Sequence, residues 1–188
     1  MFATIAVTAV VLLATVLAFA ATKPDSFRVE RATRIEAPPE KIFPLINDFR
    51  SWGYWSPYEK LDPIMRRTYS GPANGNGAVY EWKGNTKAGQ GRMEIMESYP
   101  PSTIAIKLDF IKPFEGHNIA EFTLEARGDS TNVTWAMYGS DPYIAKVMTI
   151  FFSRDRMVGA QFEAGLANLK IIAEVQVAHE VLGFARVD

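Results

Sequence analysis

The sequence of 188 residues contains no cysteine and only two histidines. Without cysteine the chain has no disulfide framework, no thiolate nucleophile and no cysteine-ligated zinc site. An excess of charge of one sign is also lacking, because 20 Lys and Arg face 21 Asp and Glu, for a net charge of −1. Capture of nucleic acid needs a basic surface that neutralises phosphates, so this balance argues against nucleic acid as a partner.

The first 21 residues carry no charge: 18 are apolar and three are Thr. As a helix, residues 2–21 would span ~30 Å, about the thickness of a bilayer core. A signal peptide is one interpretation, with the small-residue pattern Ala18-Phe19-Ala20 and cleavage before Ala21. However, no Lys or Arg precedes the run, and it is longer than the ~7–15 apolar residues usual in signal peptides. We therefore predict that residues 1–22 form a single-pass transmembrane anchor.

The side of the membrane occupied by the rest of the chain stays open. Basic residues from Lys23 to Arg34 follow the apolar run, and the positive-inside rule would keep the domain cytoplasmic. These cations fall in a segment with strand character, so they belong to a folded domain and are a weak topology signal. We predict one domain over residues 27–175 and a tail over residues 176–188.

A series of strands is predicted for most of the domain. Residues 27–35 alternate between apolar and charged side chains, which is typical of a strand with one wet face. Further strand-like runs are separated by turn residues such as Gly71-Pro72, Gly84-Asn85 and Pro100-Pro101. These runs cover residues 65–69, 78–83, 91–98, 103–111, 116–125 and 132–139. Serial strands with short turns imply an antiparallel meander.

Three helices complete the prediction. A short helix opens at Glu40 and is kept short or broken by Pro44, and a second covers residues 143–152. In the last third, apolar residues recur at helical spacing at Val158, Phe162, Leu166 and Leu169. The tail after residue 175 is interpreted as a frayed helix or a loose end. A curved sheet whose concave side is closed by one long helix defines an α+β domain.

Three segments resemble a known family. Residues 35–43, the aromatic segment 52–59 and the helical segment 162–170 are similar to the polyketide cyclase/dehydrase-type branch of the START-like (Bet v 1-like, SRPBCC) superfamily. The resemblance covers residues 27–174. It implies the helix-grip fold, a seven-stranded antiparallel sheet around a long C-terminal helix with an apolar cavity between them. Superfamily members include lipid carriers, aromatase/cyclases, hydrolase-like enzymes and chaperone co-factors, so the resemblance is specific for fold rather than activity.

Catalytic signatures are weak. No serine lies in a nucleophile elbow, and the glycine-rich segment 71–77 lacks the Gly-Lys-Ser/Thr ending of a phosphate loop. His117 shares its strand parity with Glu121, opposite the apolar Phe122, which points it outward or to a cavity rim. Glu59 ends the aromatic segment near a cavity mouth, where a capping or salt-bridging role is favoured over catalysis. We predict no catalytic residue, no metal site and no cofactor.

Aromatic residues carry the strongest functional signal. Ligand pockets are mostly apolar with a few placed polar groups, which this chain can supply within a fold known for cavities. The alternative is that these side chains only fill the core. The predicted ligand-binding residues are Trp55, Tyr58, Tyr80, Trp82, Met93, Asn118, Trp135, Met137 and Phe162.

Three functions are compatible with the sequence. The favoured one is a membrane-anchored module that binds a hydrophobic small molecule or lipid in its cavity. The second is a cyclase- or dehydratase-type enzyme that acts on a hydrophobic substrate in the same cavity. The third is a chaperone co-factor-like module that binds protein through the outer surface of the sheet. The identity of the ligand and the oligomeric state stay open.

Overall fold

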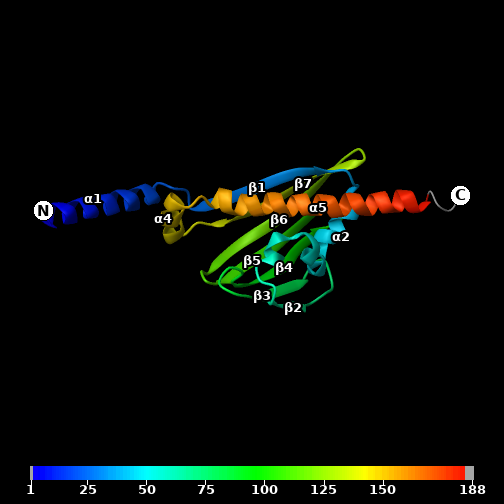
Figure 1. Cartoon of the computed structure of the whole chain (residues 1–188), viewed down its shortest axis with the longest axis horizontal. Coiled ribbons are helices and arrows are strands. Elements are labelled where there is room, and N and C mark those ends of the chain that lie inside the picture. The colour runs from blue at the N-terminus through cyan, green and yellow to red at the C-terminus, as the bar shows by residue number, and fades with distance from the viewer. Residues whose placement is uncertain (1, 185–188) are drawn as a thin grey trace.

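The computed structural model describes residues 2–184. Figure 1 shows an N-terminal helix that projects away from a curved sheet, and a long C-terminal helix that lies along the sheet. The helices are α1 (Phe2–Ala21), α2 (Pro39–Asn47), α3 (Trp52–Trp55), α4 (Tyr143–Phe151) and α5 (Arg154–Phe184), with 3-10 turns η1 (Phe49–Ser51) and η2 (Pro57–Lys60). The strands are β1 (Ser26–Ile35), β2 (Arg66–Ser70), β3 (Val79–Lys83), β4 (Gln90–Tyr99), β5 (Thr103–Lys112), β6 (Gly116–Arg127) and β7 (Ser130–Ser140).

The seven strands form one antiparallel sheet in the order β1-β7-β6-β5-β4-β3-β2. Strands β2 to β7 form a meander, in which each strand pairs with the next along the chain. Strand β1 is separated from the meander by α2 and α3 and pairs with the last strand, from Ser26 opposite Ser140 to Ile35 opposite Thr131. The seven-stranded antiparallel sheet is therefore confirmed, and β2 and β1 are its two edges.

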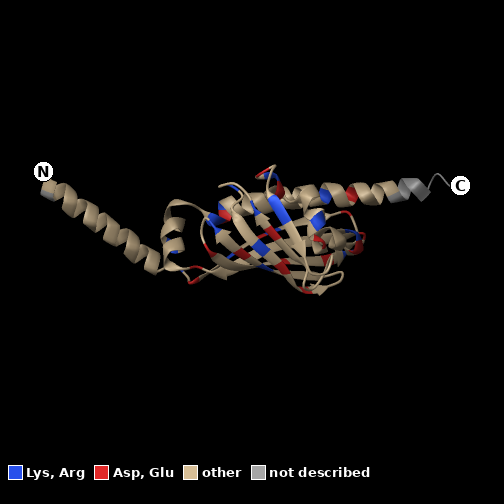
Figure 2. Ribbon diagram, turned by 90° about the horizontal axis from the view of Figure 1, so that it is seen from below, with Lys and Arg blue, Asp and Glu red and all other residues tan. Residues whose placement is uncertain are grey.

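Alternation along the strands separates the two faces of the sheet. On β6, Ala120, Phe122 and Leu124 are buried, whereas His117 and Glu125 on the opposite face are exposed. Successive side chains on a strand point to opposite faces, so each strand presents one apolar row to the interior. Figure 2 shows charged residues spread over the strands and α5, whereas α1 has none.

The long helix follows the predicted spacing. Phe162, Leu166, Leu169 and Ala173 are buried and recur every three or four residues, as the apolar stripe of a helix must. The helix continues through residues 176–184 of the predicted tail, whereas residues 185–188 lie outside the described part. In α2, Pro44 lies inside the helix without ending it.

An aromatic cluster fills the core next to α3. Trp52 and Trp55 contact each other with ring centroids 4.8 Å apart, and both meet Phe122 of β6 edge-on at 6.0 Å. The indole N–H groups of Trp52 and Trp55 donate to the carbonyl oxygens of Ile46 and Leu45, both at 2.9 Å. These bonds satisfy the one polar atom that each buried tryptophan brings, so α3 is fixed against α2.

Helix α1 stands apart from this core. Residues 4–21 have a mean hydropathy of 2.5, and only 6% of this segment is buried. Its length and composition suffice to cross a membrane, and a signal sequence has the same properties.

Candidate ligand-binding cavity

A cavity of about 230 Å³ lies between the sheet, η2 and α5. Its wall is mostly aromatic and aliphatic, with Glu59 and Lys87 as the charged residues among those that line it. The lining residues are Trp52, Tyr58, Glu59, Leu61, Met65, Tyr80, Trp82, Lys87, Ala88, Met93, Leu108, Phe110, Ala120, Trp135, Met137, Val158 and Phe162. A mostly apolar cavity with a few polar groups is typical of small-molecule sites.

The pleat of the sheet brings the lining residues of the strands together. Each of β3, β5 and β7 contributes a pair of residues two positions apart: Tyr80 with Trp82, Leu108 with Phe110, and Trp135 with Met137. Residues i and i+2 of a strand share one face, so each pair points to the same side. The antiparallel register places Tyr80 opposite Met93, which extends the wall onto β4.

Seven of the nine predicted ligand-binding residues line this cavity: Tyr58, Tyr80, Trp82, Met93, Trp135, Met137 and Phe162. Trp55 does not, because it is fully buried in the neighbouring aromatic cluster. Asn118 lies outside as well, in a groove described below. A ligand contact at any of the nine residues stays a prediction.

Helix α5 closes the cavity through one close aromatic contact. The ring of Phe162 stacks on the indole of Trp135, with centroids 4.0 Å apart and an interplanar angle of 11°. Gly165, one turn further along α5, leaves room for the same indole, since a Cβ there would lie 2.8 Å from its Cζ3 atom. The missing side chain at Gly165 thus lets this helix approach the sheet closely.

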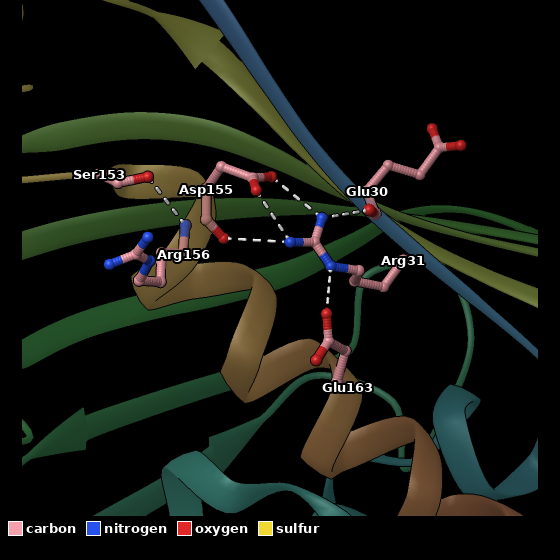
Figure 3. Close-up of polar contacts among 6 residues, drawn as sticks. All are labelled: Glu30, Arg31, Ser153, Asp155, Arg156 and Glu163. Atoms are coloured by element: carbon pink, nitrogen blue, oxygen red, sulfur yellow. Dashed lines mark hydrogen bonds and ion pairs between the residues drawn. The ribbon is translucent and has the colours of Figure 1, made fainter.

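An ion-pair cluster fastens the start of α5 to β1 (Figure 3). The Arg31 guanidinium donates from Nε to Glu163 at 2.6 Å, and from Nη1 and Nη2 to the two carboxylate oxygens of Asp155 at 3.0 and 2.9 Å. Such a two-pronged contact matches the planar fork of arginine to a carboxylate. The hydrogen bonds from Arg31 lower the pKa of Asp155, so this carboxylate stays charged and paired with Arg31 at neutral pH.

Two further bonds join α5 to the end of β1. Lys170 Nζ donates to the carbonyl oxygen of Arg34 at 2.8 Å, and the backbone N–H of Glu36 donates to Glu174 at 2.8 Å. The polar links between α5 and the sheet thus follow a single strand over several turns of the helix. The opposite side of the cavity is formed by η2 and β3, which contribute Tyr58, Tyr80 and Trp82.

Glu59 is held by two partners at the cavity wall. Its Oε2 accepts from Arg67 Nε at 2.6 Å, and its Oε1 accepts from the Tyr80 hydroxyl at 2.6 Å. Burial, followed by the hydrogen bond to Glu59, raises the pKa of Tyr80, so this phenol stays protonated as a donor. Both carboxylate oxygens are engaged, as a salt-bridging role requires.

Trp135 and Tyr58 each bring one polar group to the cavity wall. The Trp135 indole Nε1 is buried and has no hydrogen-bond partner among residues 2–184. Burial raises the pKa of Tyr58, whose ring meets the Trp135 ring edge-on at 6.2 Å, so its hydroxyl also stays protonated at neutral pH. A buried N–H donor without a partner is uncommon in a protein interior, and here it belongs to a residue that lines the cavity.

A groove on the outside of the domain adjoins the cavity. Phe110, Met137 and Val158 line both spaces, and Asn118 and His117 line the groove. The His117 side chain is 67% exposed, and its Nδ1 lies 2.7 Å from Asp109 Oδ1. The expected position of His117 at a rim is therefore observed, and we call this space the outer groove.

Sequence reasoning missed the polar partners of the site. At the start of α5, Arg156 is exposed, whereas Arg154 is partly buried. The Arg154 guanidinium donates to the buried Asp141 at 2.6 Å and lies 4.0 Å above the Phe27 ring. Arg31 and Arg67 looked like ordinary charges on strands, since the partners of Arg31 lie more than 120 residues away.

A long C-terminal helix held by a seven-stranded antiparallel sheet, with an apolar cavity between them, defines a helix-grip protein. Residues 26–174 match the family described as polyketide cyclase/dehydrase and lipid transport. The chain belongs to this family, within the Bet v 1-like SRPBCC superfamily. The resemblance stated from the sequence is confirmed.

Solved structures share the fold at low sequence identity. A Chromobacterium violaceum protein has 16% identity and a TM-score of 0.56, covering 81% of this chain and 99% of its own. The Aha1 dimer from Colwellia psychrerythraea has 18% identity and a TM-score of 0.55, covering 79% and 97%. Ara h 8.0201 has 14% identity and a TM-score of 0.51, covering 79% and 97%. The comparison with curated proteins gives no match.

Proposed function

We propose that this chain is a membrane-tethered module that binds a hydrophobic molecule in the cavity and gives one hydrogen bond to it from Trp135. The observation that carries the proposal is the buried indole N–H of Trp135, which has no partner among the described residues. An unsatisfied buried donor costs about 1–3 kcal/mol. A side chain that served only to fill the core would be expected to have its N–H satisfied, as Trp52 and Trp55 do.

The cavity restricts the chemistry of the ligand. Its apolar wall favours a hydrophobic body, and Trp135 calls for one acceptor atom, such as a carbonyl, hydroxyl or carboxylate oxygen. A volume of about 230 Å³ suits a compact molecule or one end of a longer chain. The family description, which includes lipid transport, supports the same class of ligand.

Binding is favoured over acid–base catalysis by the state of Glu59. This carboxylate is the acidic group of the cavity wall, and both of its oxygens are bound by Arg67 and Tyr80. A general acid or base needs to reach the substrate proton directly or through one water.

Membrane tethering is the second part of the proposal. Helix α1 is apolar over residues 4–21 and almost entirely exposed. Exposure of such a helix to water would cost about 25 cal/mol per Å² of apolar surface, so a bilayer is its favourable surrounding.

The test uses the full chain, purified gently from its own host and analysed by native mass spectrometry with lipid extraction. We expect a stoichiometric apolar molecule that carries an oxygen acceptor. Trp135→Phe keeps an aromatic ring and removes the donor, so affinity for the extracted molecule should fall about 2- to 12-fold, the value of one hydrogen bond.

Trp55→Phe is the matched control, because its N–H is already bound to Leu45 outside the cavity. This variant should lose stability and keep its affinity. An empty protein that also ignores an apolar probe such as anilinonaphthalene sulfonate would overturn the binding proposal. Equal affinities of wild type and Trp135→Phe would overturn the role of the indole.

A further inference from the structure

Helix α4 has its charge inside and its apolar residues outside. Its one charged residue, Lys146, is 5% exposed, whereas Ile144 and Phe151 are 69% and 66% exposed. A helix on the surface of a protein in water has the opposite arrangement, with apolar residues toward the core. The outward face of α4 is therefore suited to an apolar surrounding.

The apolar surface continues into the start of α5. Phe152 directly follows α4 and is 62% exposed, and Met157 in the first turn of α5 is 64% exposed. Together with Tyr143, Ile144, Met148 and Phe151 they form a surface that we call the α4 face. Contiguous apolar surface of this kind marks an interaction site in a soluble domain.

Polar contacts hold α4 in this orientation. The Lys146 ammonium donates to the Lys23 carbonyl oxygen at 3.0 Å and forms an ion pair with Asp25, in the segment that links α1 to β1. At the base of α4, the ion pair between Arg154 and Asp141 joins the residues just before and just after the helix. The outward position of the apolar residues is thus set by specific bonds on the inner side.

The end of α1 lies beside this face. The Tyr143 hydroxyl donates to the carbonyl oxygen of Leu17 at 2.7 Å, and Figure 1 shows α4 next to the C-terminal end of α1. Leu17 lies four residues before the last residue of α1, which is about 6 Å along a helix axis. If α1 spans a bilayer, this contact puts Tyr143 at the depth of the interface, where tyrosine is enriched.

We infer that the α4 face lies in the surface of the lipid bilayer that α1 spans, and that the outer groove opens toward this surface. The inference rests on the tethering part of the proposed function. A lipid surface is the partner because the α4 face adjoins the end of an apolar helix of membrane-spanning length. An amphipathic helix binds such a surface with its apolar side in the region between headgroups and acyl chains.

This position gives the ligand a route. Val158 lines the cavity, the outer groove and a further hollow beside α4 that also contains Met148, Phe152 and Met157. Ala145 of α4 lines both the hollow and the outer groove. On this inference a hydrophobic molecule passes between the bilayer and the cavity beside Val158 and Ala145, with Arg154 as a charged residue that lines both the hollow and the outer groove.

The absence of cysteine makes the test direct. Single variants Ile144→Cys and Phe152→Cys carry an environment-sensitive fluorophore in the full chain, reconstituted in phosphatidylcholine nanodiscs. Nitroxide groups on the acyl chains should quench these labels about twofold or more above the quenching of a label at Ile171→Cys. Ile171 is the matched control, since it is 61% exposed on α5 and outside the α4 face. Val11→Cys reports insertion of α1.

The quenching results show whether lipid, water or a second protein copy covers the α4 face. If the label at residue 11 is quenched and those at 144 and 152 behave like that at 171, α1 is inserted and the inference is overturned. If the labels at 144 and 152 are shielded from both the acyl-chain nitroxide and a water-soluble quencher, a second protein copy covers the face, which also overturns it. If the label at residue 11 is not quenched, tethering and the inference both fail, whereas ligand binding is decided separately by the mass spectrometry above.

Discussion

The guanidinium group of Arg31 lies against the backbone of α5 at Gly159, where no side chain separates the strand from the helix. A Cβ atom at Gly159 would overlap the Nη2, Cζ and Nε atoms of Arg31. The glycine thus allows the arginine to reach Asp155 and Glu163 on both sides of it. The stack of Phe162 on Trp135 depends on the same close approach of α5 to the sheet.

The effect of Gly159→Ala on the free energy of unfolding should have opposite signs with arginine and with alanine at position 31. In a helix interior alanine is about 0.8–1.0 kcal/mol more favourable than glycine, yet in the wild type the new methyl group must displace Arg31. We expect a lower free energy of unfolding for Gly159→Ala alone. In an Arg31→Ala background the same substitution should raise it by about 1 kcal/mol. Urea titrations of the four proteins measure this cycle, and additive effects would show that the two residues do not compete for space.

The Arg31 cluster should also give a pH-dependent contribution to stability. Arg31 lowers the pKa of Asp155 below its ordinary value of 3.8. The contribution is therefore complete above that value and is lost as the pH falls through the lower pKa of the folded state. Asp155→Asn should reduce Tm at pH 7, and the difference from wild type should vanish in acid. A difference that is constant from pH 7 to acid would mean that the charge of Asp155 contributes nothing.

Arg67 should stabilise the domain through Glu59. The Glu59 side chain is 7% exposed, and Arg67→Met would leave its carboxylate without its cationic partner. We expect a loss of about 1–3 kcal/mol in the free energy of unfolding. Glu59→Gln in the same background should restore part of it, because the neutral amide needs no counter-charge. Arg66→Met, at the neighbouring exposed position, is the control and should change stability little.

The fate of α1 can be measured on the native protein. If it is an anchor, the full-length mass should stay in the membrane fraction after high-salt and carbonate washes. A soluble product that begins near Ala21 would instead identify a cleaved signal peptide. Lys146→Met distinguishes anchoring by α1 from the attachment of α4. This variant should loosen α4 from Lys23 and Asp25 and leave membrane retention unchanged.

The repetitive parts of the fold could be predicted from the sequence. Alternation in residues 27–35 and helical spacing from Val158 to Leu169 each require only neighbours along the chain, and both elements were found. The long helix of residues 154–184 continues past residue 175, where the sequence was interpreted as a frayed helix or a loose end.

The site could be predicted only in part, for a physical reason. Trp55 and Trp135 are the same residue type, and the local sequence does not say that only Trp55 finds an acceptor, the Leu45 carbonyl. Likewise, the pattern of residues 143–152 indicates a helix with one lysine but not which side faces the domain. That orientation is set by Lys23 and Asp25, more than 120 residues earlier.

The hydrogen bonds and ion pairs between α5 and β1 fix one side of the cavity. Arg31, the Arg34 carbonyl and Glu36 hold the helix there. On the opposite side, within residues 2–184, α5 is tied by the bond from Asn168 Nδ2 to the Trp55 carbonyl oxygen at 3.0 Å, next to η2. We therefore expect a larger ligand to displace Tyr58, Leu61 and Met65 and to leave the position of α5 on β1 unchanged. Related chains that bind ligands of different size should accordingly differ in sequence at residues 57–65 more than along α5.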